Sequence, residues 1–361
     1  MVLLSNILKQ INLLFKKLNM SLKNLNVATK IPKDLKKKLK IKKINQIYEK
    51  FEKSLNISEN FVVAVSGGPD SLALAFLAKI YSIRRGLISK FLIIDHKLRP
   101  ESTKEAKTVR SLLKRYSIKS KILSWNGKKP QNNIQAKARE KRYELLFNES
   151  DKYKISNILI GHHQDDLIEN FFIRMLRGSG LKGLISLDKK NKFGNKNLFR
   201  PLIGHTKDEL IFIAKKVFNF YIRDPSNQDG KYQRIVIRKL ITELQKSGLD
   251  KNKFNNTLKN LRYSDKVINF YVNNNLKKNS FLSRESNRLI LKKEYFEQPY
   301  EVIFRSLSES LKLIGKKANP VRGKKLDNTI SNIKNGKFSK QTIGNCIIEK
   351  VSQTIIITKE H

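Results

Sequence analysis

Short apolar runs alternate with longer segments of helical periodicity between residues 61 and 176. Residues 61–65 and 91–94 are continuous apolar runs that are too short for helices, which is typical of strands buried on both faces. Further strands are expected over 118–125 and 156–163. Helical spacing follows each run, from 71, over 101–116, over 134–149, and up to 176. This β–α alternation predicts an α/β fold with a parallel, Rossmann-like sheet and helices on both faces.

The pattern changes beyond this α/β part. Residues 251–281 and 289–320 have helical character, and the Ile-rich end of the chain indicates a β-hairpin or small sheet. We therefore expect a basic N-terminal arm (1–50), an α/β domain (51–245) and a smaller, basic helical and α+β region (246–361). The arm is expected to be mobile, because residues 1–50 hold 13 lysines but only two acidic residues.

The string SGGPDS, at positions 66–71, separates the first expected strand from the first helix. Gly67 and Gly68 permit a turn that directs backbone N–H groups to one point at the positive end of the helix dipole. Such nests bind anions, usually phosphate. Asp70 would be repelled by a phosphate unless a cation lay between them, which predicts Mg²⁺ at Asp70. The alternative is a tight turn without a ligand. A Walker A loop is excluded, because it needs a Lys-Ser or Lys-Thr pair.

A second dense group of polar residues lies between positions 161 and 184. At about 100° per residue, His162, Asp166 and Glu169 share one face of the expected helix. A histidine and two carboxylates on one face are costly unless they bind a metal, an ammonium group or arginines. The alternative is a solvated face with ordinary surface charges. Arg174 and Arg177, before a Gly-Ser-Gly turn, favour contact with an anion, and a simple helix end is the alternative.

The formal net charge is +44, with 75 Lys and Arg residues against 31 Asp and Glu. A charge of this size favours a polyanionic partner, with nucleic acid as the leading candidate. A biased composition that spreads lysine over every surface is the alternative. The single cysteine, Cys346, excludes an internal disulfide framework and suits a reducing cytoplasm. No apolar run approaches the length of a membrane span.

Taken together, the motifs resemble those of the tRNA(Ile)-lysidine synthetases, which belong to the PP-loop ATP pyrophosphatases. SGGPDS resembles their ATP loop, and DHKLR at 95–99 resembles Asp-His-Gly-Leu-Arg. The other matching segments are NIQAKAREKRY (133–143), HHQDDLIEN (162–170), RGSGLKGL (177–184), RPL (200–202), DPSN (224–227) with Tyr232, Arg234 and Arg238, and TIGNC (342–346). The chain departs from the family pattern at Lys97, Leu167, Asn170, Ile235 and Asn345.

This resemblance implies an enzyme that uses ATP and Mg²⁺ to join L-lysine to C2 of the wobble cytidine in a CAU-anticodon tRNA(Ile). The reaction passes through an adenylated tRNA and releases AMP and pyrophosphate. The single cysteine and the absence of a long apolar run favour a cytoplasmic location without a membrane partner. Dimers are common among such folds, so a homodimer and a monomer both stay open. Residues 51–245 would be the catalytic domain, and residues 246–361 would bind tRNA.

The resemblance also assigns roles to individual residues. The implied catalytic residues are Asp70, which also holds the metal, with Arg142, His162, His163, Asp166 and Glu169. The implied ATP contacts are Ser66, Gly67, Gly68, Pro69, Asp70, Ser71, Asp95, His96, Arg139 and Arg142. The implied lysine and tRNA contacts are Asp165, Asp166, Glu169, Arg174, Arg177, Arg200, Arg234 and Arg238. Asp166 and Glu169 would seat the lysine ammonium, and either His162 or His163 would accept the proton.

Two alternatives remain open. A sister class with the same loop thiolates cytidine in tRNA, but it would need paired cysteines or a cluster, whereas this chain has only Cys346. The other alternative is a basic RNA-binding protein without activity, on a relic ATPase fold. The intact set of Asp70, Asp166, Glu169 and arginines argues against such decay.

Overall fold

A computed structural model describes residues 31–127, 132, 134–222, 233–283, 288–316, 321 and 323–360. The side chain of Gln135 is not among the described parts. The chain divides into two compact units, Met1–Leu249 and Asp250–His361. No helix among the described residues is both long enough and apolar enough to cross a membrane.

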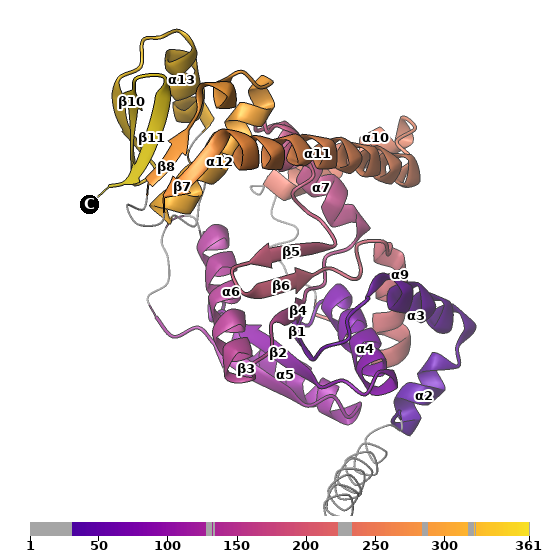
Figure 1. Cartoon of the computed structure of the whole chain (residues 1–361). Coiled ribbons are helices and arrows are strands. Elements are labelled where there is room, and N and C mark those ends of the chain that lie inside the picture. The colour runs from indigo at the N-terminus through magenta and orange to yellow at the C-terminus, as the bar shows by residue number, and fades with distance from the viewer. Residues whose placement is uncertain are drawn as a thin grey trace, which may run out of the picture. The chain divides into compact units, whose positions relative to one another are not determined.

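The first unit is built on a six-stranded sheet (Figure 1) with the order β3-β2-β1-β4-β6-β5. Its strands are β1 (Phe61–Val65), β2 (Ser89–Asp95), β3 (Ser120–Ser124), β4 (Asn157–Leu159), β5 (Lys190–Phe193) and β6 (Lys196–Phe199). All neighbouring pairs are parallel except β5–β6. The predicted α/β fold with a parallel sheet is confirmed. The β5–β6 hairpin was not anticipated, because its strands are rich in Lys and Asn.

Both faces of this sheet are covered, which is why the central strands read as continuous apolar runs. In β1, Phe61, Val63 and Val65 belong to one buried cluster, whereas Val62 belongs to another on the opposite face. The helices are α4 (Pro69–Arg84), α5 (Ser102–Arg115), α6 (Ile134–Lys152), α7 (Gln164–Met175), α8 (Leu181–Leu184), α9 (Lys207–Ile213) and α10 (Gln233–Lys246). A π-helical turn, Ala214–Phe218, continues α9. Helix α4 is buried along most of its length, so it belongs to the interior of the unit and not to its surface.

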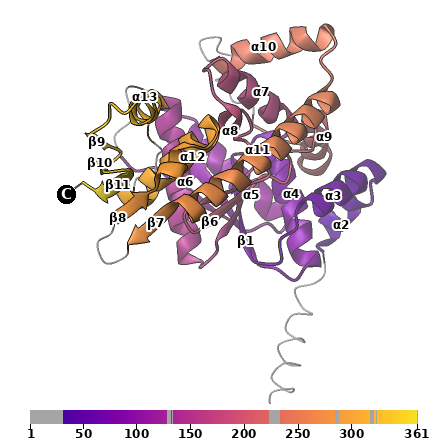
Figure 2. The ribbon, with the colours of Figure 1, turned by 45° about the horizontal axis from the view of Figure 1, so that its top comes forward.

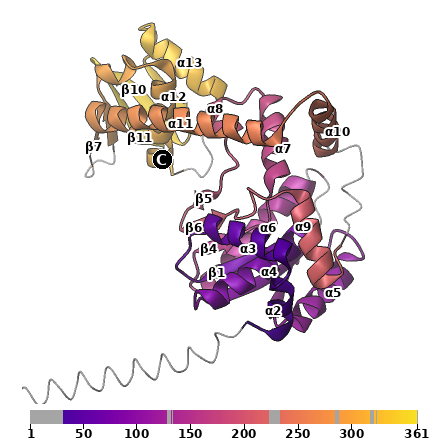
Figure 3. The same ribbon diagram turned by 90° about the vertical axis from the view of Figure 1, so that its right-hand side faces the viewer.

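The prediction of a separate basic arm over 1–50 is wrong for its described part. Two helices, α2 (Lys33–Leu39) and α3 (Lys42–Ser54), pack against the α/β core (Figure 3). Ile44, Tyr48 and Phe51 lie on the inner face of α3, and the Phe51 ring meets Tyr81 of α4 edge-on at 6.2 Å. The lysines occupy the outer face, so the charge count concealed an amphipathic helix. Residues 1–30 lie outside the described part of the chain.

The second unit packs helices against an antiparallel sheet (Figure 2) with the order β7-β8-β11-β10-β9. Its strands are β7 (Ser280–Ser283), β8 (Arg288–Leu291), β9 (Lys340–Ile343), β10 (Cys346–Val351) and β11 (Thr354–Lys359). Its helices are α11 (Lys251–Asn279), α12 (Tyr300–Gly315), α13 (Gly323–Lys334) and the short 3₁₀ turn Lys293–Phe296. The predicted helix over 289–320 begins too early, because residues 289–291 pair with β11 as a strand.

Candidate active site

The residues 66–71 form a tight turn between β1 and α4 that closes around the Ser71 hydroxyl. The Ser71 Oγ accepts the backbone N–H groups of Ser66 (3.1 Å) and Gly67 (3.0 Å), and donates to the Gly68 carbonyl (3.0 Å). Gly67 has φ 89°, and a Cβ atom there would lie 2.6 Å from Val109. Only glycine therefore fits this position. The loop has the expected strand–turn–helix geometry, and it ends at the N-terminus of α4.

A second segment approaches this loop from the end of β4. A Cβ atom at Gly161 would lie 3.3 Å from the Ser71 backbone nitrogen, so the two backbones pass in close contact. This approach brings the 161–169 segment beside the residues that were predicted to hold phosphate. The two polar groups singled out in the sequence thus belong to one site.

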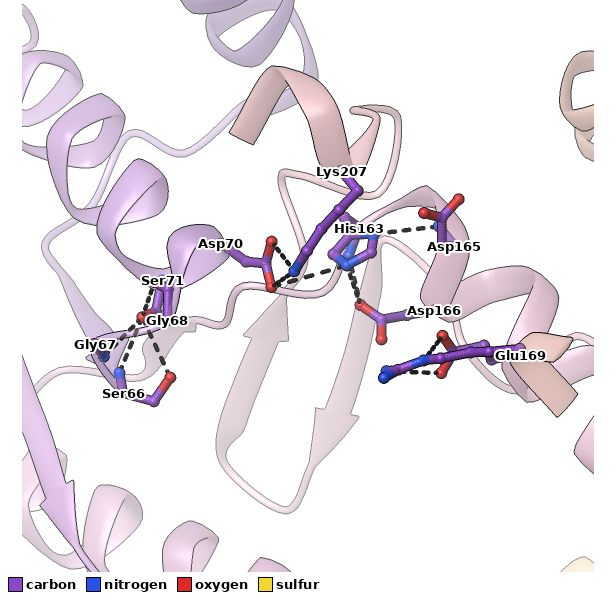
Figure 4. Close-up of polar contacts among 11 residues, drawn as sticks. Ser66, Gly67, Gly68, Asp70, Ser71, His163, Asp165, Asp166, Glu169 and Lys207 are labelled. Atoms are coloured by element: carbon purple, nitrogen blue, oxygen red, sulfur yellow. Dashed lines mark hydrogen bonds and ion pairs between the residues drawn. The ribbon is translucent and has the colours of Figure 1, made fainter. Parts of the chain in front are cut away.

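The Asp70 carboxylate lies between the two segments and is paired with a lysine (Figure 4). Lys207 Nζ lies 2.8 and 2.7 Å from the two Asp70 oxygens, and His163 Nε2 lies 3.8 Å from Asp70 Oδ2. Lys207 is the first residue of α9 and is 137 positions away from Asp70. Sequence reasoning missed Lys207, because nothing local distinguishes it among 75 basic residues.

The predicted placement of His162 on the same helix face as Asp166 and Glu169 is wrong. Helix α7 begins at Gln164, so both histidines precede it, and His163 is its N-cap. His163 Nδ1 accepts the Asp165 N–H at 3.2 Å, and Asp166 Oδ2 accepts the His163 N–H at 2.8 Å. This reciprocal capping arrangement satisfies helix donors that would otherwise lack partners, which fixes the helix start.

Both histidines use Nδ1 as an acceptor, which fixes their neutral tautomer. His162 Nδ1 accepts from Arg200 Nε at 3.0 Å, as His163 Nδ1 does from Asp165. Each neutral ring then carries its hydrogen on Nε2. Burial lowers the pKa of His162 to about 4, and the positive charge of Arg200 adds to this effect. His162 is therefore a hydrogen-bond donor at neutral pH and a poor proton acceptor.

The two carboxylates of α7 differ in environment. Burial alone would raise the pKa of Asp166, but the two histidines and the His163 N–H outweigh burial and hold this pKa below its ordinary value. Glu169 is buried, and burial raises its pKa although Arg238 opposes that shift. Arg238 binds Glu169 with two hydrogen bonds, of 2.6 and 3.3 Å. Asp166 thus stays ionised, whereas Glu169 is already paired with Arg238 of the same chain.

Two predicted ligand contacts have internal roles instead. Asp95, at the end of β2, is 1% exposed and accepts from Ser102 (2.8 Å), Thr103 (2.7 Å) and the Lys97 N–H (3.0 Å). Its carboxylate therefore holds the start of α5 rather than facing ATP directly. Arg200 is 3% exposed and donates to His162 and to the Asp188 carbonyl, so it orients the imidazole from behind.

His96, next to Asp95, does face a hollow. Its ring meets Trp125 edge-on at 6.5 Å, and Arg142 Nε donates to its Nε2 at 3.4 Å. Burial, together with the charge of Arg142, lowers the pKa of His96 to about 4. The hollow is lined by His96, Lys97, Trp125, Asn126 and Gly127. Its aromatic and amide groups suit a planar base.

The remaining predicted contacts lie toward the outside of the unit. Arg139 lies 5.6 Å from the Tyr143 ring, and Arg177 donates to Gln233 at 2.9 Å. Arg174 lies on α7 and Arg234 lies on α10, and these two helices contact each other. The motif residues at 133, 224–227 and 232 lie outside the described part of the chain.

Within the described ranges, no group of three or more His, Cys, Asp or Glu side chains could hold a metal ion. A magnesium ion that is carried in by a nucleotide needs only one or two protein carboxylates, because phosphates and water supply the remaining ligands. The Asp70 carboxylate fits this requirement.

Comparison with known proteins identifies the family. The PP-loop domain model matches residues 36–244. The tRNA(Ile)-lysidine synthase of Orientia tsutsugamushi (strain Boryong) is 35% identical over 314 residues, covering 82% of this chain and 69% of the relative. That of Wolbachia pipientis wMel is 32% identical over 303 residues, covering 82% and 70%. The chain belongs to the tRNA(Ile)-lysidine synthase family. The family resemblance predicted from the motifs is confirmed.

As a lysidine synthase with a PP-loop domain, the protein is an enzyme of the ligase class that uses ATP. A solved U34-tRNA thiolase, NcsA from Methanococcus maripaludis, is similar in fold, with a TM-score of 0.52 and 18% identity over 60% of this chain and 79% of that one. That thiolase carries an iron–sulfur cluster. The present chain has one cysteine, Cys346, which is buried in the second unit.

Proposed function

We propose that this lysidine synthase joins L-lysine to C2 of the wobble cytidine in a CAU-anticodon tRNA(Ile), with ATP as the activating substrate. The observation that carries the proposal is a row of polar side chains, in which Lys207 binds Asp70 and His163 Nε2 lies 3.8 Å from Asp70 Oδ2 and 3.7 Å from Asp166 Oδ2. It joins the 66–71 loop to an ionised carboxylate, and the two half-reactions need these two groups. The family supports the identity of tRNA and lysine.

The first step is adenylation of the cytosine. The base O2 attacks the α-phosphorus of ATP, and pyrophosphate leaves with the bond electrons. The 66–71 loop would hold the pyrophosphate at the N-terminus of α4, where the positive end of the helix dipole faces the charge that develops. Asp70 would bind Mg²⁺, which would neutralise phosphate charge there. Lys207, released from Asp70 by that ion, would then pair with a phosphate oxygen.

The second step is attack by lysine. Free lysine is protonated at neutral pH, so its ammonium needs an anionic seat. Asp166 is the group we assign to this seat, because Glu169 is already paired with Arg238. The ammonium has no lone pair, so Asp166 would first accept one proton from it and pass that proton to solvent. The neutral nitrogen then attacks C2, the C2–O bond breaks, and AMP leaves with the bond electrons. Attack acidifies the nitrogen, which would lose its second proton to Asp166, since a neutral Nε2–H donor such as His162 cannot take it.

Other parts of the proposal rest on chemistry alone. The hollow beside His96 and Trp125 would take the adenine, and Arg142 would stabilise charge on the α-phosphate. The second unit and the basic surface would hold the tRNA backbone. The division into a catalytic domain (51–245) and a tRNA-binding region (246–361) and a cytoplasmic location stay predictions, and a homodimer and a monomer both stay open.

One assay tests the proposed function. The purified protein is incubated with ATP, Mg²⁺, radiolabelled lysine and a tRNA(Ile) transcript with a CAU anticodon, and a tRNA(Met) transcript is the control. We expect lysine in the first transcript alone, with equal amounts of AMP and pyrophosphate. ATP cleavage without lysine transfer would contradict the proposal that this enzyme joins lysine to tRNA(Ile). Transcript binding without ATP cleavage would favour an RNA-binding protein without activity.

A further inference from the structure

The second unit exposes a stripe of apolar and aromatic side chains on its long helix, α11. Tyr263, Val267, Phe270 and Tyr271 are 51%, 57%, 61% and 52% exposed. Their spacing of four, three and one residues places them on one face of a helix. The opposite face packs into the unit, because Leu258, Val272 and Asn275 are buried there. The stripe is therefore not part of the core.

Lysines flank these rings, and no carboxylate lies among them. Lys259, Lys266, Lys277 and Lys278 are exposed and fall within about 140° of arc with the four apolar side chains. Lys259 Nζ and Lys266 Nζ each lie 5.7 Å from the centre of the Tyr263 ring. Asp265 is the one acidic residue of α11, and Arg305 binds it on the inner side at 2.5 Å.

The rings are arranged so that their faces stay accessible. Phe270 and Tyr271 pack edge to face, with ring centres 5.5 Å apart and an angle of 82° between planes. In such a pair the edge of one ring covers a face of the other, so the pair itself leaves at least one face of each ring uncovered. Exposed aromatic faces between lysines are the combination that binds unpaired nucleotides, because bases stack on the rings while phosphates pair with the ammonium groups.

We propose that this face of α11, which we call the α11 platform (Lys259, Tyr263, Lys266, Val267, Phe270 and Tyr271), stacks unpaired bases of the tRNA substrate. The inference rests on the proposed function for the identity of the RNA. A second copy of the chain is disfavoured as the occupant, because two such faces would bring their lysines together without a carboxylate to offset them. Paired bases in a duplex are also disfavoured, since their faces are already stacked.

Leucine substitutions separate stacking from simple apolar contact. The test pair is Phe270→Leu with Tyr271→Leu, which keeps apolar area but removes both π faces. The matched pair is Phe270→Tyr with Tyr271→Phe, which keeps both rings. Leu313→Ala, an exposed apolar position on α12, is the control for a general surface effect. Affinities are measured by fluorescence anisotropy for the CAU tRNA(Ile) transcript, a short single-stranded RNA and a duplex of equal length.

We expect the leucine pair to bind the transcript and the single strand at least about tenfold more weakly, with duplex affinity and the salt dependence unchanged. The matched pair and Leu313→Ala should bind as the parent protein does. Full transcript and single-strand affinity in the leucine pair would overturn the proposal, as would an equal loss in the matched pair. A dimer of the parent chain that the leucine pair converts to a monomer, seen by sedimentation velocity, would assign the face to a second copy instead.

Lysine incorporation measured on the same preparations separates the two hypotheses. If the parent chain makes lysidine but the leucine pair binds tRNA normally, the proposed base stacking by the α11 platform is wrong, whereas the proposed enzymatic function is supported. If single-strand binding falls in the leucine pair but the parent chain makes no lysidine, the proposed enzymatic function is wrong. The α11 platform is then supported as an RNA-binding surface.

Discussion

The side-chain partners of individual residues decide which chemistry the site can perform. His162 and His163 are adjacent and chemically identical in the sequence, and either one was predicted to be the proton acceptor or relay. Arg200 and the Asp165 N–H occupy their Nδ1 atoms, so both neutral rings present a donor to the site. In the mechanism that we propose, the proton acceptor is therefore Asp166, whose surroundings hold its pKa below the ordinary value before attack.

His163 has two separable roles, as helix cap and as donor near Asp70 and Asp166. In His163→Asn, the amide oxygen can still accept the Asp165 N–H, because Asn is a good N-cap. We expect this variant to keep its melting temperature but to lose lysine transfer by about 10²-fold. His163→Ala should lose activity and about 1 kcal/mol of stability as well. Melting curves and initial rates of both variants check this, and equal stabilities would contradict the capping role.

Lys207 should act on the ATP half-reaction. Lys207→Met leaves Asp70 without its cation and removes a charge that would meet the phosphates. We expect pyrophosphate release to fall by about 10²–10³-fold. Lys207→Arg should retain more of the rate, and Lys215→Met, at an exposed position in the π-helical turn after α9, should change little. Single-turnover pyrophosphate release is the measurement. A normal rate in Lys207→Met, with lysine transfer alone impaired, would place Lys207 in the second step.

The low pKa values of His162 and His96 predict that acid destabilises the first unit. Both pKa values fall from 6.5 to about 4 on folding, so between these pH values the unfolded chain binds protons that the folded chain does not. The free energy of unfolding should therefore be highest above pH 6.5, and it should fall by a few kcal/mol toward pH 4. The fluorescence of Trp125 in urea titrations reports on this unit. His162→Asn, which keeps an acceptor for Arg200, should flatten the curve, and an unchanged slope would contradict the assignment.

At the scale of elements, the sequence predicted what depends on local periodicity. The central strands β1 and β2 were located because both of their faces are buried, which leaves uninterrupted apolar runs. The β5–β6 hairpin was missed, because Lys and Asn make up most of the edge strand β5 and begin its partner β6. Helix α3 was not predicted, because the many lysines of the N-terminal segment surround the helical spacing of its apolar residues Ile44, Ile47 and Phe51. Lys207 was missed because its pairing with Asp70 depends on tertiary structure alone.

The docking of α3 is testable as a core contact. Phe51 is fully buried against Tyr81, so Phe51→Ala should lower the free energy of unfolding of the first unit by about 3–5 kcal/mol. Lys53→Ala, in the exposed part of the last turn of the same helix, is the control and should stay within about 0.5 kcal/mol. Urea denaturation followed by Trp125 fluorescence measures both. A small loss in Phe51→Ala would restore the interpretation of this segment as an arm outside the core.

At the scale of the whole molecule, the net charge of +44 has two explanations, a surface directed at RNA or a composition that puts lysine everywhere. Salt dependence separates them, because each phosphate that a lysine neutralises adds about 0.7 to the slope of log affinity against log salt for single strands. Neutralising Lys259, Lys266 and Lys277 of α11 by glutamine should lower that slope by about 2 for the transcript. The same change at Lys36, Lys37 and Lys40, which are exposed in and just after α2, should leave it nearly constant. Equal slopes in the two triple variants would mean that lysines all over the surface contribute alike to RNA binding. The basic surface would then attract RNA without holding it in one position.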